Sequence, residues 1–341
     1  AAAAAHARAA LAADSGAGTI GDPFGDLQYA LNSITRDATN GDRINIKAGT
    51  AEILAATLSF ASYGTGTGAA PLLFAGYNSV ENDGGLGAIN GNAGNFNIYD
   101  GTAHFIGFLD LDLYNTGSAS VAKLPAKAGG SANFYRCKLH GTTSYAIEDN
   151  GSIGTVFGCH IYDFGADGVL LDEGTIVGNY IVCSDSNNRA INAAVPSPGM
   201  IHIARNIISI SADSNGIVIG SVGHAYIGHN SILTTFAGTK RGIFLQNANG
   251  GACVYNLVEG FTGAGGAGVE ISSGAQSFMV AGNGAFNCTD AYDFTGDLNF
   301  NLGDNETLSA SPFRKTDSDT FENRFNFYAP ARVGNVHGGA I

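Results

Sequence analysis

The acidic residues best suited to chemistry gather near the middle of the chain. Residues 148–173 contain six carboxylates, and they are followed by Arg189 and His202. A general base beside a cation can remove the proton at C5 of a uronic acid, whereas two carboxylates about 5 to 10 Å apart can hydrolyse a glycosidic bond. An ordinary solvated surface is the alternative interpretation. The candidate catalytic residues are Asp149, Asp163, Asp167, Asp172 and Glu173.

A second acidic pair lies earlier, where Asp110 and Asp112 alternate with Leu109, Leu111 and Leu113. Successive residues of a strand point to opposite faces, so this pattern predicts that the leucines fill a core and that both carboxylates point outward. Neighbouring carboxylates are suited to Ca²⁺ or to acid–base catalysis, and a solvated face is again the alternative. Calcium is the one cofactor that the sequence suggests.

An asparagine recurs at nearly constant spacing in the second half of the chain, with about 26 residues per step, as in a repeat protein. One interpretation is a track of ligand-binding amides. The favoured interpretation is a structural ladder of stacked amides at a tight turn, in the left-handed backbone conformation that such a turn requires. The predicted ladder residues are Asn179, Asn206, Asn230, Asn256 and Asn283.

Two cysteines occupy the same repeat position further upstream. Cys137, Cys159 and Asn179 follow one another at steps slightly shorter than those between the asparagines. The expected Cα separation of the two cysteines, close to the spacing of neighbouring strands, permits a disulfide. Buried thiols are the favoured alternative, because the other three cysteines have no evident partner.

Short strands are predicted on either side of these recurring asparagines and cysteines, for example at 216–219, 242–245 and 268–271. A period of roughly 25 residues with several short strands per turn is typical of a β-solenoid. Ahead of the repeats, Leu27, Ala30, Leu31 and Ile34 fall at helical spacing. Asp26 is positioned to cap that helix.

The helix, the turn at 40–42 and the strand at 44–46 resemble the N-terminal cap of right-handed parallel β-helix proteins of the pectate-lyase-like superfamily. The resemblance covers roughly residues 20–295. It implies an all-β solenoid with an N-terminal capping helix and an irregular C-terminal cap. We therefore predict an Ala-rich segment at 1–20, the solenoid at 21–295, and a cap or extended tail at 296–341. The fold hosts many functions, so it does not select one.

The composition limits the classes of partner that can be expected. The formal charge of −13 would repel a phosphate backbone, so nucleic acid is not expected. No apolar run approaches the roughly 18 residues of a membrane span. The chain has no Trp, and tyrosines such as Tyr145 and Tyr162 are the candidate sugar-binding side chains.

Motifs do not single out an enzyme. The residue sets typical of polygalacturonases and the pectate-lyase arginine motif are not recognisable, and His229, directly before Asn230, fits a turn. We expect first a structural or adhesive subunit that self-associates, in an appendage, a surface layer or a virion fibre or spike, and therefore extracellular. The alternatives are a lyase or hydrolase of an acidic glycan, and a non-catalytic module that binds a surface glycan.

Overall fold

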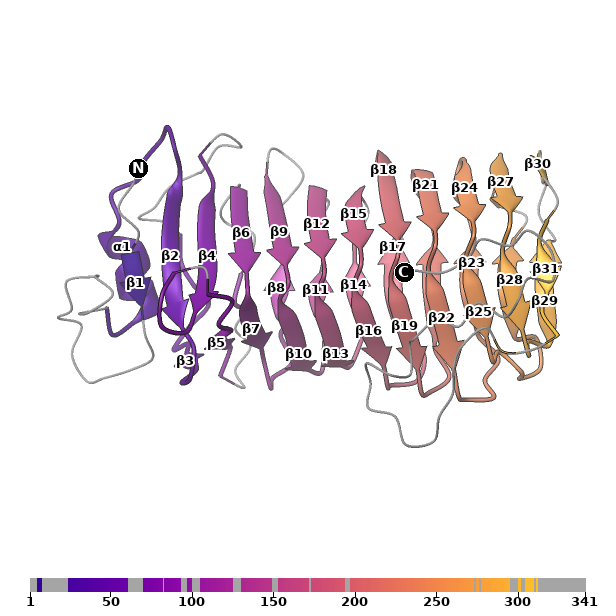
Figure 1. Ribbon diagram of the computed structural model, residues 1–341, viewed down its shortest axis with the longest axis horizontal. Coiled ribbons are helices and arrows are strands. Elements are labelled where there is room, and N and C mark those ends of the chain that lie inside the picture. The colour runs from indigo at the N-terminus through magenta and orange to yellow at the C-terminus, as the bar shows by residue number, and fades with distance from the viewer. Residues whose placement is uncertain are drawn as a thin grey trace. The chain divides into compact units, whose positions relative to one another are not determined.

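The computed structural model describes 5–7, 24–60, 70–81, 83–92, 97–99, 105–124, 130–148, 153–171, 173–193, 197–272, 274–275, 277–294, 300–301, 304–309 and 311. Contacts divide the chain into two compact units, Ala1–Gly165 and Ala166–Ile341. Each unit is a parallel β-solenoid, and the structure is nearly all β, as predicted (Figure 1).

The first unit contains the one described helix, α1 (Leu27–Ser33), which follows the strand at Ala5–Ala7. Asp26 caps it as predicted, because its carboxylate accepts a hydrogen bond of 2.7 Å from the Tyr29 backbone N–H. The helix is shorter than the sequence pattern suggested, since Ile34 already has an extended backbone. Leu27, Ala30 and Leu31 form its buried face.

Three parallel sheets build the first unit. The first sheet has the order β1 (Ala5–Ala7), β2 (Asp42–Lys47), β4 (Leu72–Tyr77), β6 (Phe105–Leu109), β9 (Ser131–Tyr135) and β12 (Ile153–Phe157). The second has the order β3 (Glu52–Ile53), β5 (Gly87–Asn90), β7 (Leu111–Tyr114), β10 (Lys138–Thr142) and β13 (His160–Phe164). The third pairs β8 (Ala122–Lys123) with β11 (Ile147–Glu148).

The second unit repeats the three-sheet plan with six described strands in each sheet. Its first sheet has the order β15 (Glu173–Val177), β18 (Ser197–Ala204), β21 (Val222–Gly228), β24 (Gly251–Val254), β27 (Phe278–Ala281) and β30 (Phe300–Asn301). Its second has the order β16 (Tyr180–Cys183), β19 (Ile207–Ile210), β22 (Ser231–Thr234), β25 (Leu257–Glu259), β28 (Gly284–Phe286) and β31 (Glu306–Thr307). Its third has the order β14 (Val169–Leu170), β17 (Arg189–Ala193), β20 (Asn215–Ile219), β23 (Arg241–Leu245), β26 (Ala267–Ile271) and β29 (Asp290–Phe294).

The register between neighbouring coils places side chains of the same type on top of one another in the core. In the first unit the rings of Phe74, Phe108 and Phe134 stack at centroid distances of 5.5 and 5.0 Å. In the second unit Ile203 pairs with Ile227, and both are fully buried. Each such side chain contributes roughly 1.5–3 kcal/mol of burial free energy.

The asparagine ladder is confirmed as a set of side-chain hydrogen bonds. Each amide nitrogen donates to the amide oxygen of the next coil: Asn179 to Asn206 at 2.9 Å, Asn206 to Asn230 at 3.0 Å, Asn230 to Asn256 at 3.0 Å and Asn256 to Asn283 at 2.9 Å. Asn283 then donates to Asn305 at 2.9 Å, so the ladder runs beyond residue 295, the predicted end of the solenoid. Sequence inspection missed Asn305.

The predicted left-handed conformation belongs to a different residue. The residue directly before each ladder position has the positive φ: 55° at Arg205, 58° at His229 and 56° at Tyr255. The predicted turn role of His229 is therefore confirmed. The asparagine uses its amide to bond between coils, while its predecessor makes the turn.

Cys137 and Cys159 are buried free thiols. The Cys137 Sγ donates to the Phe108 carbonyl at 3.4 Å, and the Cys159 Sγ donates to the Phe134 carbonyl at 3.5 Å. Burial raises the pKa of the Cys137 thiol well above its ordinary value, followed by the effect of the neighbouring Cys159. The Cys137 thiol is therefore protonated and unreactive at neutral pH. In the part of the chain that the structure describes, no helix is long and apolar enough to cross a membrane.

Candidate functional site

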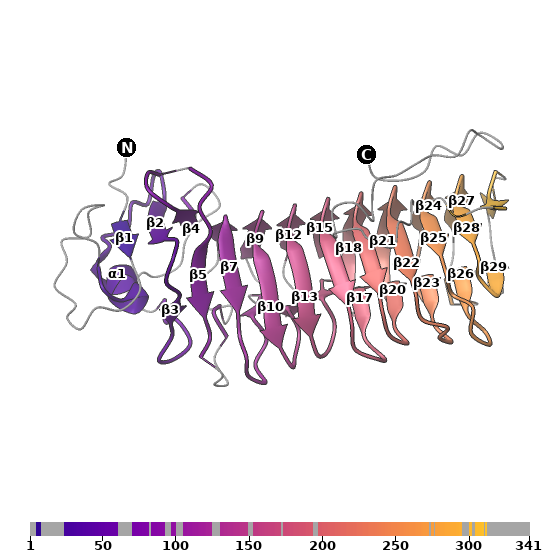
Figure 2. The same cartoon turned by 60° about the horizontal axis from the view of Figure 1, so that its bottom comes forward.

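A row of stacked rings lies on the outer face of β7, β10 and β13 in the first unit. The strands place Tyr114, His140 and Tyr162 at one register position. The residue before each ring is a buried leucine or isoleucine, so the rings point away from the core. Figure 2 shows these three strands side by side. We call this row, together with Asp112, Lys138 and His160 at the adjacent register position, the ring platform.

The rings of the platform hold one another in place. The Tyr114 and His140 centroids are 5.2 Å apart with an interplanar angle of 11°, and those of His140 and Tyr162 are 4.5 Å apart at 9°. The His160 ring lies 4.4 Å from Tyr162. Stacking follows from the parallel register, because neighbouring strands are about 4.8 Å apart. The imidazole of His140 is thus fixed between two tyrosines.

Charge on the platform favours proton transfer. The Asp112 Oδ1 lies 2.9 Å from the His140 Nε2, so the carboxylate orients the imidazole. With the Nε2 proton directed at Asp112, the Nδ1 lone pair is left as the proton acceptor, and Nδ1 has no hydrogen-bond partner among the described residues. Burial, followed by the charges of Asp112 and Asp163, raises the pKa of Tyr162, which keeps this hydroxyl protonated.

Lys138 adds a cation to the platform. It lies between Asp112 and His160 in the register and is half-buried. Within the described ranges its ammonium group forms no ion pair. The platform therefore combines an oriented base, a protonated hydroxyl and an unpaired cation, the groups that proton abstraction beside a carboxylate requires.

The predicted catalytic carboxylates are divided between the two units, and two of them lie outside the described residues. Asp149 and Asp172 lie outside the described residues. Asp163 is exposed next to Tyr162 in the first unit, with a φ of 54°. Asp167 and Glu173 belong to the second unit. Glu148 ends β11, on the third sheet of the first unit, whereas Glu173 opens β15, on the first sheet of the second unit.

Asp167 braces a turn. It is 5% exposed, and it accepts hydrogen bonds from the Arg189 backbone N–H at 3.0 Å and from the Asn192 amide at 2.8 Å. The Arg189 guanidinium lies 3.3 Å away. Burial raises the pKa of the Asp167 carboxyl, while the Asn192 and Arg189 contacts oppose this shift. Its oxygens face the protein, which favours a structural role.

The predicted orientation of Asp110 is wrong. Asp110 lies in the turn between β6 and β7 with a φ of 53°, and it is 7% exposed. Both of its oxygens are bonded to Arg136, at 2.7 and 2.6 Å. Asp112 does point outward, but toward His140. Among the described residues no three His, Cys, Asp or Glu side chains are grouped to hold a metal ion, and calcium binding stays a prediction.

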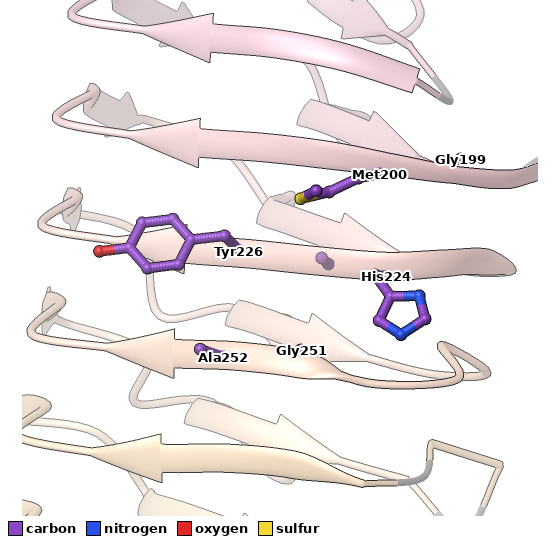
Figure 3. Close-up of a pocket in the computed structure, with 7 residues that line it drawn as sticks. Gly199, Met200, His224, Tyr226, Gly251 and Ala252 are labelled. Atoms are coloured by element: carbon purple, nitrogen blue, oxygen red, sulfur yellow. The ribbon is translucent and has the colours of Figure 1, made fainter.

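A hollow of about 510 Å³ lies on the first sheet of the second unit (Figure 3). Its lining comes from β18, β21 and β24: Gly199, Met200, His224, Ala225, Tyr226, Gly251 and Ala252. Glu173 reaches its edge, because a Cβ on Gly199 would lie 2.1 Å from the Glu173 carboxyl carbon. This predicted catalytic residue therefore borders a surface depression. We call the depression the Tyr226 hollow.

Sequence inspection missed Tyr114, Lys138 and His140 of the ring platform, and Met200 and Tyr226 of the hollow. A usable signal was present for the rings. His140 lies three residues after Cys137, and Tyr162 lies three residues after Cys159. The repeat therefore already aligned the two rings.

No protein-family model matches the chain, and no curated protein matches it. Among solved structures the chain is similar to a crystal structure of pectate lyase Pel9A, at 13% identity and a TM-score of 0.57, over 98% of this chain and 92% of that chain. It is also similar to the A-module of the Azotobacter vinelandii mannuronan C-5 epimerase AlgE4, at 14% identity and a TM-score of 0.45, over 79% and 75% of the two chains. The first similarity confirms the predicted parallel β-helix fold, without identifying a subfamily.

Proposed function

We propose that the protein is an enzyme that cleaves an acidic polysaccharide by β-elimination at the ring platform. The observation that carries this proposal is the Asp112–His140 pair, fixed between Tyr114 and Tyr162. Such a pair supplies an oriented imidazole base, which is the first requirement for removing a carbon-bound proton.

Each group on the platform has a role in the proposed reaction. Lys138 pairs with the uronate carboxylate and stabilises the negative charge that develops there. His140 removes the C5 proton, the C4–C5 double bond forms, and the C4–oxygen bond breaks. The Tyr162 hydroxyl, kept protonated by its raised pKa, gives a proton to the leaving oxygen. The proton taken by His140 is returned to Tyr162 through solvent.

The form of the platform supports a polymeric substrate. The rings lie on the outer face of a sheet rather than in an enclosed pocket, and sites for small molecules usually enclose most of the ligand. An extended chain can lie across successive strands instead. The similarity to a structure named as a pectate lyase supports the same substrate class, although at 13% identity it shows the fold and not the activity.

Incubation with a panel of uronate polymers, with Ca²⁺ and with a chelator, tests the proposal. We expect ultraviolet absorbance from an unsaturated product, and we expect His140→Ala to lower the rate about 10²–10⁴-fold because general-base catalysis is worth about that much. Asp112→Asn should also lower it, since the amide cannot stabilise the imidazolium.

The matched control is Tyr135→Ala, which removes an exposed ring from another face of the same unit and should leave the rate unchanged. Reducing ends without the absorbance would replace elimination by hydrolysis. Full activity in His140→Ala would contradict the assignment of the base.

A second candidate function is self-association, carried by exposed apolar side chains on β9 and β12. Ile153 is 50% exposed, Phe157 is 47% exposed, and Tyr135 pairs in register with Phe157. We propose that this face packs against a second copy, as expected for a structural or adhesive subunit. An extracellular location and a surface-glycan partner stay predictions.

Sedimentation velocity over a range of concentrations measures self-association. We expect oligomers for the unmodified chain and a shift to monomer for Phe157→Asp, because a buried charge at the contact is unfavourable. Phe236→Asp, which changes an exposed ring in the second unit, is the control. A monomer at every concentration would rule this candidate out.

A further inference from the structure

The Tyr226 hollow is built from small residues under a few large ones. Gly251 has a φ of 141°, and a Cβ on it would lie 1.9 Å from the Ala225 carbonyl oxygen. A Cβ on Gly199 would lie 2.1 Å from the Glu173 carboxyl carbon, so a side chain there would require Glu173 to move. Larger side chains are therefore excluded from this part of the floor, and the depression between Met200, His224 and Tyr226 follows from that exclusion (Figure 3).

The Tyr226 ring is held flat on the sheet. A Cβ on Gly228 would lie 2.5 Å from the Tyr226 hydroxyl oxygen, so the ring covers the backbone of its own strand. His202 contacts the ring from the neighbouring strand, with centroids 4.9 Å apart at an angle of 68°. The half-buried ring is therefore held by its own strand and by His202, and Figure 3 shows it lying along β21.

The strands that line the hollow carry no formal charge, and the Glu173 carboxylate lies at its edge beside Gly199. Strands β18, β21, β24 and β27 contain no Asp, Glu, Lys or Arg, although the whole chain has a formal charge of −13. Burial lowers the pKa of His202, which keeps this imidazole neutral at neutral pH. The hollow thus offers the aromatic face of Tyr226, the flexible thioether of Met200 and the imidazole of His224.

These properties restrict the ligand. Met200 is 61% exposed and His224 is exposed, so the hollow is open and cannot enclose a small molecule. A ligand that fits has one apolar face for the Tyr226 ring and polar groups at its rim for His224. A pyranose ring, with its C–H face and its hydroxyl groups, has this pattern, and a chain of such rings can extend over the neighbouring strands.

We propose that the Tyr226 hollow binds one pyranose unit of a polysaccharide chain without cleaving it. The Tyr226 ring packs on the C–H face of the sugar, Met200 adjusts to its edge, and His224 bonds its hydroxyl groups. The site is separate from the ring platform in residues and in unit, so it stands whether or not the platform cleaves its substrate.

Binding of two probes to the full-length chain tests the site: a galacturonic acid hexamer and a neutral glucose hexamer, cellohexaose. The His140→Ala background prevents consumption of the acidic probe. We expect one or both probes to bind, and Tyr226→Ala to weaken the dissociation constant at least tenfold. The two probes separate a preference for acidic chains from a preference for neutral ones.

Gly228→Ala is the sharper variant, because its new methyl group must displace the Tyr226 ring without removing it. We expect it to weaken binding as well, while circular dichroism confirms the fold. Phe236→Ala, which removes an exposed ring of the same unit outside the hollow, should bind like the background. If both hollow variants bind like the background, or if neither probe binds at all, the proposal is overturned.

Failure of the sugar-binding proposal can be distinguished from failure of the proposed cleavage activity. Absence of any unsaturated product, together with probe binding that Tyr226→Ala abolishes, overturns the platform chemistry and supports the hollow. Product formation together with unaltered binding in Tyr226→Ala and Gly228→Ala does the reverse.

Discussion

Each ladder asparagine satisfies several polar groups with one small side chain. The Oδ1 of Asn230 accepts from both the backbone N–H and the amide of Asn206, and its own amide donates to the Ile203 carbonyl and to Asn256. All of these groups are buried, where an unpaired donor or acceptor is costly. At the same position in the first unit, cysteine makes the bond to a carbonyl: the Cys137 Sγ donates to the Phe108 carbonyl.

We predict that Asn230→Ala lowers the free energy of unfolding by about 1–3 kcal/mol, because the Asn206 backbone N–H loses its acceptor and the Asn206 amide loses one of its two. Denaturant unfolding monitored by circular dichroism measures the change. Asn247→Ala, at an exposed position of the same unit, should change stability by less than about 0.5 kcal/mol. Equal losses in the two variants would contradict a specific role for the ladder.

At the scale of elements, one turn recurs between the first and second strands of the coils. A single residue with a positive φ follows the first strand, and the ladder residue comes next, directly before the second strand. The types at this position include Gly178, Arg205, His229 and Tyr255, so the turn accepts a large side chain if it is not β-branched. A large side chain is tolerated at this position because it points outward from the coil.

The pair His229→Val and His229→Gly isolates this backbone requirement. We expect His229→Val to destabilise the protein by about 1–2 kcal/mol, since a β-branched residue is strained at a φ of 58°. Glycine populates this conformation readily and should be close to neutral. Thermal unfolding of the two variants measures the difference in stability. A valine variant as stable as the glycine variant would disprove the strain argument.

At the scale of the whole molecule, each unit depends on contacts between neighbouring coils. Every core side chain meets the equivalent side chains one coil before and one coil after, as Phe108 meets Phe74 and Phe134. Solenoids of this kind are stabilised by nearest-neighbour terms. A defect should therefore be felt most in the adjacent coils.

Phe108→Ala tests this local coupling. We expect a loss of about 3–5 kcal/mol, the usual cost of deleting a buried ring. Hydrogen exchange should show the largest loss of protection in β4, β6 and β9, declining with distance in coils along the first unit. Uniform loss through that unit would indicate that it unfolds as one cooperative block instead.

The sequence by itself determined the solenoid, the N-terminal cap and the asparagine ladder. Repetition makes these features readable, because a position that recurs once in every repeat must meet its own copy in the next coil. The helix cap at Asp26 was readable for a similar reason, since its hydrogen bond spans only three residues. Local or repeated contacts leave their trace in the spacing of residue types.

The tertiary structure decided which outward side chains become neighbours. Asp110 and Asp112 are two residues apart, yet a left-handed turn sends the first to Arg136 and the second to His140. The hollow depends on a ring lying over Gly228, a contact that no periodicity encodes. The core could be predicted from its repeat. The candidate sites required the register of every strand, because coils of unequal length shift the side chains of the outer faces independently of those in the core.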